Sequence, residues 1–176
     1  MNLDSPSPQP GTWAWTPRVW APHASSLTLA HGHAVRSADL AQTVAMSPVD
    51  GRDGWWEADV ALPHGTDYAF ELDGGARLPD PRSGWQPSGV HGPSRVLDTS
   101  RHRWSDGGWT GRDVRGAEIY ELHIGTFTAE GTLDAAVARL GHLVDLGVDV
   151  VELMPLAAFP GVHGWGYDGV SPFAVH

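Results

Sequence analysis

The residues best suited to chemistry lie near the end of the sequence, in a glycine-rich loop. The apolar run 151–156, interrupted by Pro155, is typical of a buried strand in a parallel sheet. Four side chains able to bind a ligand follow it: His163, Trp165, Tyr167 and Asp168. Loops that leave the carboxyl ends of parallel strands carry ligand sites because rigid strands hold them in place. We therefore predict that these four residues belong to a binding site.

Carboxylates near the same sheet edge could form a catalytic pair with Asp168. Glu121 and Glu152 lie on the two predicted parallel strands. Glutamates near a strand end are more often hydrogen-bonded structural groups than catalytic ones. Even a carboxylate with a perturbed pKa does not identify an active site, because structural networks perturb pKa values as well. We therefore assign no catalytic residue to this chain.

Histidines give little indication of a metal. His31 and His33 are separated by one glycine, but two histidines without a third ligand define no metal site, and exposed loop histidines are the commoner case. We predict no metal and no cofactor. His123, on a predicted strand, is interpreted as a core histidine in preference to a group that shapes the pocket. Asp80 is expected to pair locally with Arg82.

The composition of the 176 residues indicates a globular protein and excludes several partners. A hydrophobic content of 41% can bury a core. The net charge of -10, with 21 acidic residues against 11 basic ones, argues against nucleic acid. The absence of cysteine excludes disulfides. No signal peptide or run of about 20 apolar residues is visible, so we expect a cytoplasmic location and no membrane partner.

Residues 17–98 show the pattern of a small immunoglobulin-like β-sandwich. Short alternating runs are separated by turn signals at 50–54, 63–66 and 73–75, and no convincing helix occurs. Ahead of the sandwich, residues 1–16 are rich in proline and serine and are predicted to form a disordered tail.

Turn-forming residues dominate the next part of the sequence. Residues 79–94 are predicted to form a loop packed on another element, and 95–97 is a candidate further strand. Residues 99–116 are predicted to be a linker, with Trp104 and Trp109 covering a seam between domains.

The spacing of apolar residues changes at residue 118, where a unit of strand, helix and strand is predicted. The run 118–124 is the first strand, and 148–154 is the second. Thr132 is the expected N-cap of the helix between them, and Gly147 is expected to stop it. Five residues at helical spacing mark one apolar face: Leu133, Ala136, Val137, Leu140 and Val144. The two strands should be parallel with a right-handed crossover.

Several separated motifs resemble the α-amylase superfamily, in the same order along the chain. Runs at 18–22, 54–57 and 68–74 are similar to the amino-terminal sandwich of its debranching, branching and trehalose-forming members. A narrower resemblance, to malto-oligosyltrehalose trehalohydrolases, rests mainly on residues 79–94 and is joined by the runs 119–128 and 151–155. The resemblance implies an all-β immunoglobulin-like sandwich followed by the first βαβ unit of an incomplete (β/α)8 barrel, in residues 117–176.

The resemblance also implies an activity, the retaining hydrolysis of the α-1,4 bond next to the terminal trehalose unit of malto-oligosyltrehalose. That chemistry needs two carboxyl groups about 5 Å apart. In the superfamily they come from later barrel strands, so the chain alone is expected to be inactive. Tyr167 matches an aromatic platform beneath the sugar ring, and aromatic faces suit the apolar patches of sugars. The implied partner is an α-glucan or malto-oligosyltrehalose.

Two alternatives stay open. A barrel of this kind takes eight strands and about 250 residues, whereas two strands can be counted before His176, so we expect a truncated barrel. The parent could then be a glycogen branching or debranching enzyme, which would share the sandwich and the barrel start. The chain could instead be a non-catalytic α-glucan-binding module.

Overall fold

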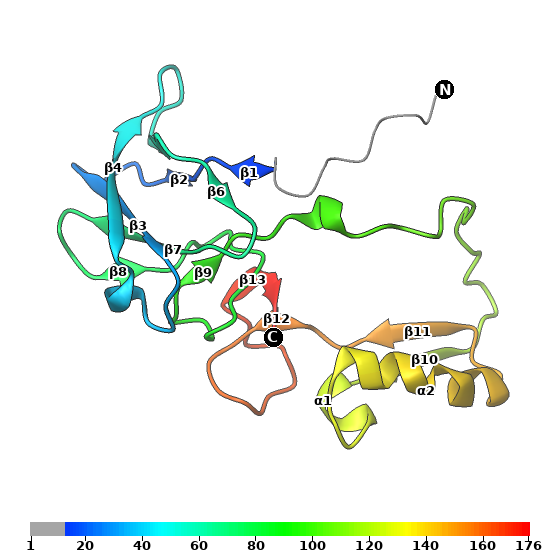
Figure 1. Ribbon diagram of the computed structural model, residues 1–176. Coiled ribbons are helices and arrows are strands. Elements are labelled where there is room, and N and C mark those ends of the chain that lie inside the picture. The colour runs from blue at the N-terminus through cyan, green and yellow to red at the C-terminus, as the bar shows by residue number, and fades with distance from the viewer. Residues whose placement is uncertain (1–12) are drawn as a thin grey trace.

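Short strands occupy the first half of the structure, a computed structural model that describes residues 13–176 (Figure 1). The strands are β1 (Ala14–Trp15), β2 (Arg18–Trp20), β3 (Leu27–Gly32), β4 (Gln42–Pro48), β5 (Trp55–Ala58), β6 (Leu62–Pro63), β7 (Asp67–Leu72), β8 (Arg77–Leu78) and β9 (Ser94–Arg95). The order in the main sheet is β2-β5-β4-β3-β7-β8, and β9 also pairs with β7. Two 3-10 turns lie at Ser37–Asp39 and Thr99–Arg101.

The core of this unit forms where alternate residues of the strands point inward. Val19 is the buried residue of β2 between two exposed ones, as alternation requires in a strand with one face in solvent. Leu29 on β3 and Phe70 on β7 are 0% and 1% exposed. Met46 and Ala58 add side chains from β4 and β5 to the same cluster. The predicted β-sandwich is confirmed.

The predicted disordered tail is too long. Its residues 1–12 lie outside the described part of the chain, but Ala14–Trp15 forms β1, which pairs antiparallel with β6. Trp13 and Trp15 pack against the sandwich core, and the Trp15 ring lies 4.9 Å from that of Tyr68. Burial of these large rings stabilises the segment, which composition alone does not reveal.

Residues 79–94 form the predicted loop, and its first turn is tied to the sandwich by a buried carboxylate. The Tyr68 hydroxyl donates to Asp80 Oδ2 at 2.8 Å, and the Asp80 backbone N–H donates to Ser94 Oγ at 2.9 Å. The Arg82 backbone N–H donates to Asp80 Oδ1. The predicted local pairing of Asp80 with Arg82 is therefore confirmed, but it is made by the Arg82 backbone N–H, while the guanidinium lies over the ring of Phe173.

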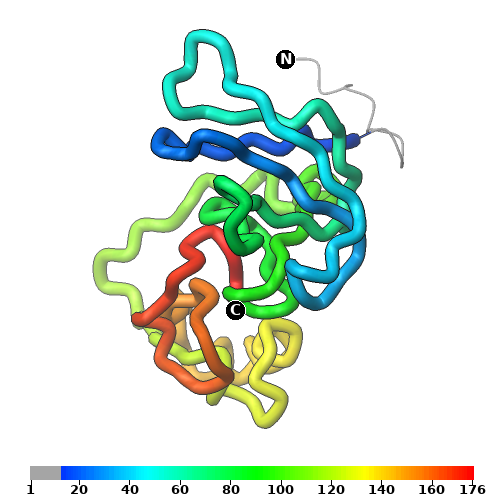
Figure 2. Tube along the Cα trace, turned by 90° about the vertical axis from the view of Figure 1, so that its left-hand side faces the viewer, coloured from blue at the N-terminus to red at the C-terminus, as the bar shows by residue number. Residues whose placement is uncertain are grey.

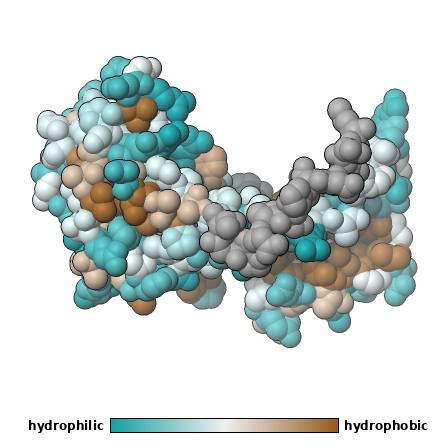
Figure 3. All heavy atoms as spheres, turned by 45° about the horizontal axis from the view of Figure 1, so that its top comes forward, coloured by the Kyte–Doolittle hydropathy of each residue, from teal (hydrophilic) through white to brown (hydrophobic). Residues whose placement is uncertain are grey.

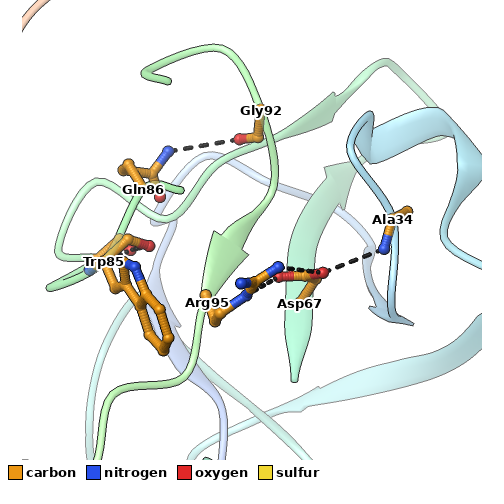
Figure 4. A network of polar contacts seen from close by, with 7 residues as sticks. Ala34, Asp67, Trp85, Gln86, Gly92 and Arg95 are labelled. Atoms are coloured by element: carbon orange, nitrogen blue, oxygen red, sulfur yellow. Dashed lines mark hydrogen bonds and ion pairs between the residues drawn. The ribbon is translucent and has the colours of Figure 1, made fainter. Parts of the chain in front are cut away.

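The carboxyl end of the loop is tied down by a second pair (Figure 4). Arg95 Nε donates to Asp67 Oδ1 at 2.6 Å, and Asp67 is 1% exposed. Asp67 Oδ2 accepts from the Ala34 backbone N–H at 3.1 Å. The Arg95 guanidinium also lies 5.1 Å from the centre of the Trp85 ring. The strand here is Ser94–Arg95, slightly earlier than the predicted 95–97.

A second unit follows in residues 119–175. It contains β10 (Ile119–Leu122), the short helix α1 (Ile124–Phe127), α2 (Leu133–Asp145), β11 (Val150–Leu153), β12 (Ala157–Ala158) and β13 (Ser171–Val175). β10 and β11 are parallel neighbours, as predicted, and α2 lies between them in the sequence. Thr132 caps α2 by accepting from the Ala135 backbone N–H at 3.2 Å, and Gly147 follows the end of the helix with φ +86°.

Much of the apolar surface of this unit is exposed. Val137 and Val144 on the predicted apolar face of α2 are 66% and 72% exposed, and Ile119 on β10 is 54% exposed. Ala136 and Leu143 are the buried residues of α2. Figure 3 shows hydrophobic side chains gathered on this part of the molecule. No helix within residues 13–176 is both long and apolar enough to cross a membrane.

The chain between the two units is an open connection. Trp104 and Trp109 are 77% and 74% exposed, so the predicted cover over a domain seam is wrong. The units meet instead where β12 and β13 return to the sandwich, as Figures 1 and 2 show. Val90, from the 79–94 loop, shares a buried cluster with Ala158 on β12 and Ala174 on β13. The seam is closed by small aliphatic side chains.

Candidate functional site

A cavity of about 780 Å³ opens where the parallel strands β10 and β11 end. His123 follows the last residue of β10 and Met154 follows the last residue of β11, and both line the cavity. α1 and the start of α2 form one wall, and the chain from β12 to β13 forms another. This is the edge at which parallel sheets hold their ligands.

His123 joins the two walls of the cavity. Its Nε2 lies 2.8 Å from the carbonyl oxygen of Gly164, so Nε2 carries the proton and donates it. Nδ1 lies 3.4 Å from Thr126 Oγ1. The prediction of a core histidine is half right. The ring is hydrogen bonded, but it is half-buried and lines the cavity, because β10 ends one residue before it.

The loop between β12 and β13, residues 159–170, depends on glycine for its path. Gly166 has φ +87°, and a Cβ atom there would lie 2.0 Å from the Pro155 carbonyl oxygen. A Cβ at Gly164 would lie 2.9 Å from the Phe159 ring, and one at Gly169 would lie 2.6 Å from Ala157 Cβ. The loop therefore packs its backbone directly against the end of β11 and against β12.

The four residues predicted for the site fall into two pairs. His163 and Trp165 line the cavity, and Trp165 is 75% exposed. Tyr167 and Asp168 lie further along the same loop, outside the cavity lining; Tyr167 is 68% exposed. The structure thus places all four on one loop but brings only the first pair together with His123.

The strand glutamates do not face this cavity. Glu121 and Glu152 are register partners across β10 and β11, and both are exposed. Neither lines the cavity. The chemistry available at the wall is therefore aromatic contact and hydrogen bonding from His123 and His163, with no carboxylate pair among the lining residues.

The two sandwich histidines are far from equivalent. His31 is 8% exposed on β3, and burial lowers its pKa, whereas His33 is exposed. The prediction of exposed loop histidines is therefore wrong for His31. Within residues 13–176, no group of three or more histidine, aspartate or glutamate side chains is placed to hold a metal ion.

Sequence reasoning missed the strand pair that closes the cavity. β12 and β13 are antiparallel, and the His176 backbone N–H donates to the Leu156 carbonyl oxygen at 2.9 Å. The His176 ring stacks on Phe159 at a centroid distance of 3.9 Å. The local signal for this pair is the alternation of Ser171, Phe173 and Val175 with other residues in β13. β12 is two residues long, which is too short to show any alternation.

The sandwich and the unit that follows it match known proteins. Residues 5–89 match the family carbohydrate-binding module 48, described as the isoamylase N-terminal domain. A candidate alpha amylase from Salmonella typhimurium has a solved structure that matches with a TM-score of 0.78 and 43% identity, covering 90% of this chain and 26% of that one. The pullulanase of Bacillus acidopullulyticus matches with a TM-score of 0.74 and 21% identity, over 92% and 24% of the chains, which supports the fold alone. The chain therefore carries a carbohydrate-binding module 48 domain and resembles α-amylase family enzymes.

Curated relatives narrow the resemblance. The malto-oligosyltrehalose trehalohydrolase of Rhizobium sp. (strain M-11) is 50% identical over 160 residues, which cover 90% of this chain and 26% of the relative. That of Mycobacterium tuberculosis (strain CDC 1551 / Oshkosh) is 46% identical over 170 residues, again 90% and 26%. The branching enzyme GlgB of Vibrio parahaemolyticus is 31% identical. The predicted resemblance to malto-oligosyltrehalose trehalohydrolase is confirmed, and the chain spans about a quarter of the length of these relatives.

Proposed function

We propose that this chain supplies the amino-terminal sandwich and the first barrel strands of a retaining glycoside hydrolase. The reaction is cleavage of the α-1,4-glucosidic bond next to the terminal trehalose of malto-oligosyltrehalose, with release of trehalose. The observation that carries the proposal is the 50% identity to a trehalohydrolase over 90% of the chain. The identity to a branching enzyme is 31%, so that alternative has weaker support.

We divide the chain accordingly into a sandwich over residues 17–98, a linker over 99–116, and the start of a (β/α)8 barrel over 117–176. The parallel pair β10 and β11, with α2 between them in sequence, supports the third unit. Further strands beside β10 and β11 would cover the exposed side chain of Ile119, and the helices that accompany them would cover that of Val137 on α2. A cytoplasmic location stays a prediction.

In this proposal the chain contributes part of a sugar subsite and no catalytic group. Retaining glycosidases place a nucleophile and an acid/base about 5 Å apart across the bond. The cavity wall of this chain holds aromatic rings and histidines instead. Tyr167 is assigned as the aromatic platform, because its exposed ring face can pack on the C–H face of a glucose unit. Trp165, His163 and Asp168 are assigned as neighbouring contacts.

A chimera tests the activity. Residues 13–176 would replace the matching quarter of the Rhizobium trehalohydrolase, and trehalose release from malto-oligosyltrehalose would be measured. We expect the chimera to turn over substrate and the isolated chain to show none above a blank. An inactive but folded chimera would contradict the proposed reaction, and turnover by the isolated chain would contradict the assignment of the carboxylates to other strands.

A second candidate function, which the carbohydrate-binding module match favours, is a module that binds glucan without catalysis. Maltoheptaose binding, read together with the activity of the chimera, separates it from the enzyme part. Calorimetric titration of the purified chain should show saturable binding that Tyr167→Ala removes. The matched control is Trp109→Ala, because Trp109 is 74% exposed in the connection between the units and should leave binding unchanged. Binding without activity in the chimera would favour the module.

A further inference from the structure

The base of the 159–170 loop rests on the sandwich. β12 and β13 flank the loop, and each sends one small residue into a cluster with Val90 of the 79–94 loop. Ala158 is 3% exposed, Ala174 is 2% exposed, and Val90 is 7% exposed. Figures 1 and 2 both show β13 lying beside the chain of the sandwich unit at this point. The cluster is buried and lies between segments far apart in sequence.

A second contact lies beside this cluster. The Arg82 guanidinium lies over the Phe173 ring of β13, 5.8 Å from its centre, in cation–π geometry. The backbones also approach closely here, since a Cβ atom on Gly84 would lie 3.9 Å from the Phe173 carbonyl oxygen. Arg82 and Val90, which come from the same loop, thus hold β13 through two successive residues, Phe173 and Ala174, whose side chains lie on opposite faces of a strand.

The 79–94 loop is itself rigidly mounted. Its first turn is fixed by the Tyr68–Asp80 hydrogen bond, and its end is fixed by the Arg95–Asp67 pair. Gln86 donates to the Gly92 carbonyl oxygen at 3.4 Å, across the middle of the loop (Figure 4). Both ends are anchored on β7, which lies inside the main sheet. Because the 79–94 loop is held at both ends, it can fix the position of β13, which it contacts.

The distal part of the 159–170 loop makes few hydrogen bonds to the rest of the structure. His123 holds Gly164, and the Val170 backbone N–H donates to the Ala158 carbonyl oxygen at 2.9 Å. Trp165 and Tyr167 remain 75% and 68% exposed. Their position therefore depends on the backbone contacts of the loop glycines and on how β12 and β13 are held at the base.

We infer that the sandwich positions the sugar-binding loop, and that Arg82 and Val90 are positioning residues acting through Phe173, Ala158 and Ala174. The sugar part of this inference rests on the proposed function. The reason is mechanical. Two strands of two and five residues make few hydrogen bonds, so the docking contacts contribute much of the stability of the loop base.

The test measures the loop directly, by hydrogen exchange of backbone amides in the purified chain. Arg82→Ala removes an exposed side chain and should leave the fold intact. We expect amides in residues 157–175 to exchange about two- to five-fold faster, the factor that corresponds to an exposed cation–π contact. Val90→Asp places a charge in the cluster and should accelerate the same amides by about tenfold or more. Amides of β3 and β7 should be unchanged in Arg82→Ala.

Matched variants separate positioning from general destabilisation. Val35→Asp adds the same charge at a residue that is 75% exposed and should leave the loop unchanged. Arg82→Lys keeps a cation over Phe173 and should restore most of the protection. In a double-mutant cycle, Arg82→Ala should have no further effect on loop exchange once Phe173 is alanine.

The outcomes divide clearly. Faster exchange confined to residues 79–94, with 157–175 as in the wild type, would overturn the inference. Weaker maltoheptaose binding in Arg82→Ala at an unchanged unfolding midpoint, rescued by Arg82→Lys, would support its functional part. If the wild-type chain bound no maltoheptaose, the sugar part of this inference would fail, whereas the chimera would still test the proposed reaction and the exchange data would still decide whether the sandwich holds the loop.

Discussion

The Tyr68 hydroxyl donates a hydrogen bond of 2.8 Å to Asp80 Oδ2, and the two residues are only 3% and 6% exposed. Tyr68 lies on β7, inside the main sheet, whereas Asp80 opens the loop on which β13 rests. Burial raises the pKa of the Asp80 carboxyl, against the opposing effects of the Arg82 N–H and the Tyr68 hydroxyl. Burial also raises the pKa of Tyr68. The joint between the two units therefore contains a titratable group.

The first prediction concerns Asp80 and pH. Because its folded pKa is raised, the folded state holds the proton more tightly than the unfolded state. Its contribution to stability is fully present below the unfolded pKa of 3.8 and is lost as pH rises through the folded pKa. In Asp80→Asn the amide can donate to Tyr68 and accept from Arg82 N–H, and this pH dependence should disappear.

Urea unfolding of both proteins between about pH 3.5 and 7 measures this effect. The free energy of unfolding of the wild type minus that of Asp80→Asn should fall with rising pH, by at most about 1.4 kcal/mol per pH unit, and then level off. If the unfolding free energies of the two proteins changed with pH in parallel over this range, Asp80 would have the same pKa in the folded and unfolded states, contrary to the prediction.

The second prediction concerns Arg95 and Asp67 (Figure 4). Arg95→Ala leaves an ionised Asp67, 1% exposed, with the Ala34 N–H as its remaining partner. The expected loss is about 3 kcal/mol of unfolding free energy, because an uncompensated buried charge is costly. Adding Asp67→Asn should recover part of it. Tryptophan fluorescence in urea measures both.

Arg36→Ala is the control for this experiment, since Arg36 pairs with Asp39 in the open, with side chains 77% and 48% exposed. Its removal should leave stability unchanged, because exposed pairs contribute little. Equal effects of Arg36→Ala and Arg95→Ala would contradict the importance of the buried pair.

Local signals in the sequence predict much of this fold. Alternation at β2 and the turn at residues 50–54 identify the sandwich, since a strand with one wet face must alternate. Thr132 and Gly147 bound α2 correctly because capping is decided within one turn of chain. Pro155 lies two residues beyond β11 and lines the cavity. The position of the cavity follows from that parallel strand pair.

Partners far apart in sequence could not be predicted. Asp80 lies two residues from Arg82, which predicts their local pairing, but the hydroxyl that also binds the carboxylate comes from a strand twelve residues back. β12 and β13 pair across the 159–170 loop, with too few residues in β12 to show a period. The exposure of Trp104 likewise could not be predicted, because whether a tryptophan in a turn-rich segment is covered depends on tertiary packing and not on the local sequence.

The third prediction concerns Gly141, in the interior of α2. A Cβ atom there would meet nothing within 4 Å, so Gly141→Ala adds no clash. Alanine should stabilise the helix by about 1 kcal/mol, because glycine loses more backbone entropy on folding. Slower hydrogen exchange of α2 amides, with sandwich amides unchanged, is the expected result. Unchanged exchange in α2 would mean that the helix does not open by itself.

The last prediction concerns Gly166, where the backbone of the 159–170 loop packs against Pro155 at the end of β11. In Gly166→Ala the new Cβ would lie 2.0 Å from the Pro155 carbonyl oxygen, and φ +87° is strained for alanine. The backbone must move to relieve this contact, and Trp165 and Tyr167 move with their neighbour. We expect faster exchange of amides 163–169 and maltoheptaose binding at least about tenfold weaker, a loss of about 1.4 kcal/mol.

Gly161→Ala separates the clash from the backbone strain. Gly161 lies in the same loop at φ +108°, but nothing lies within 4 Å of its Cβ position. It should therefore show the cost of the left-handed conformation, about 1–2 kcal/mol, without displacing the sugar-binding residues. Both variants should keep the urea midpoint of the sandwich, whose core is remote in the fold. If Gly161→Ala weakened binding as much as Gly166→Ala, backbone strain alone would explain the loss and the contact with Pro155 would not determine where Tyr167 lies.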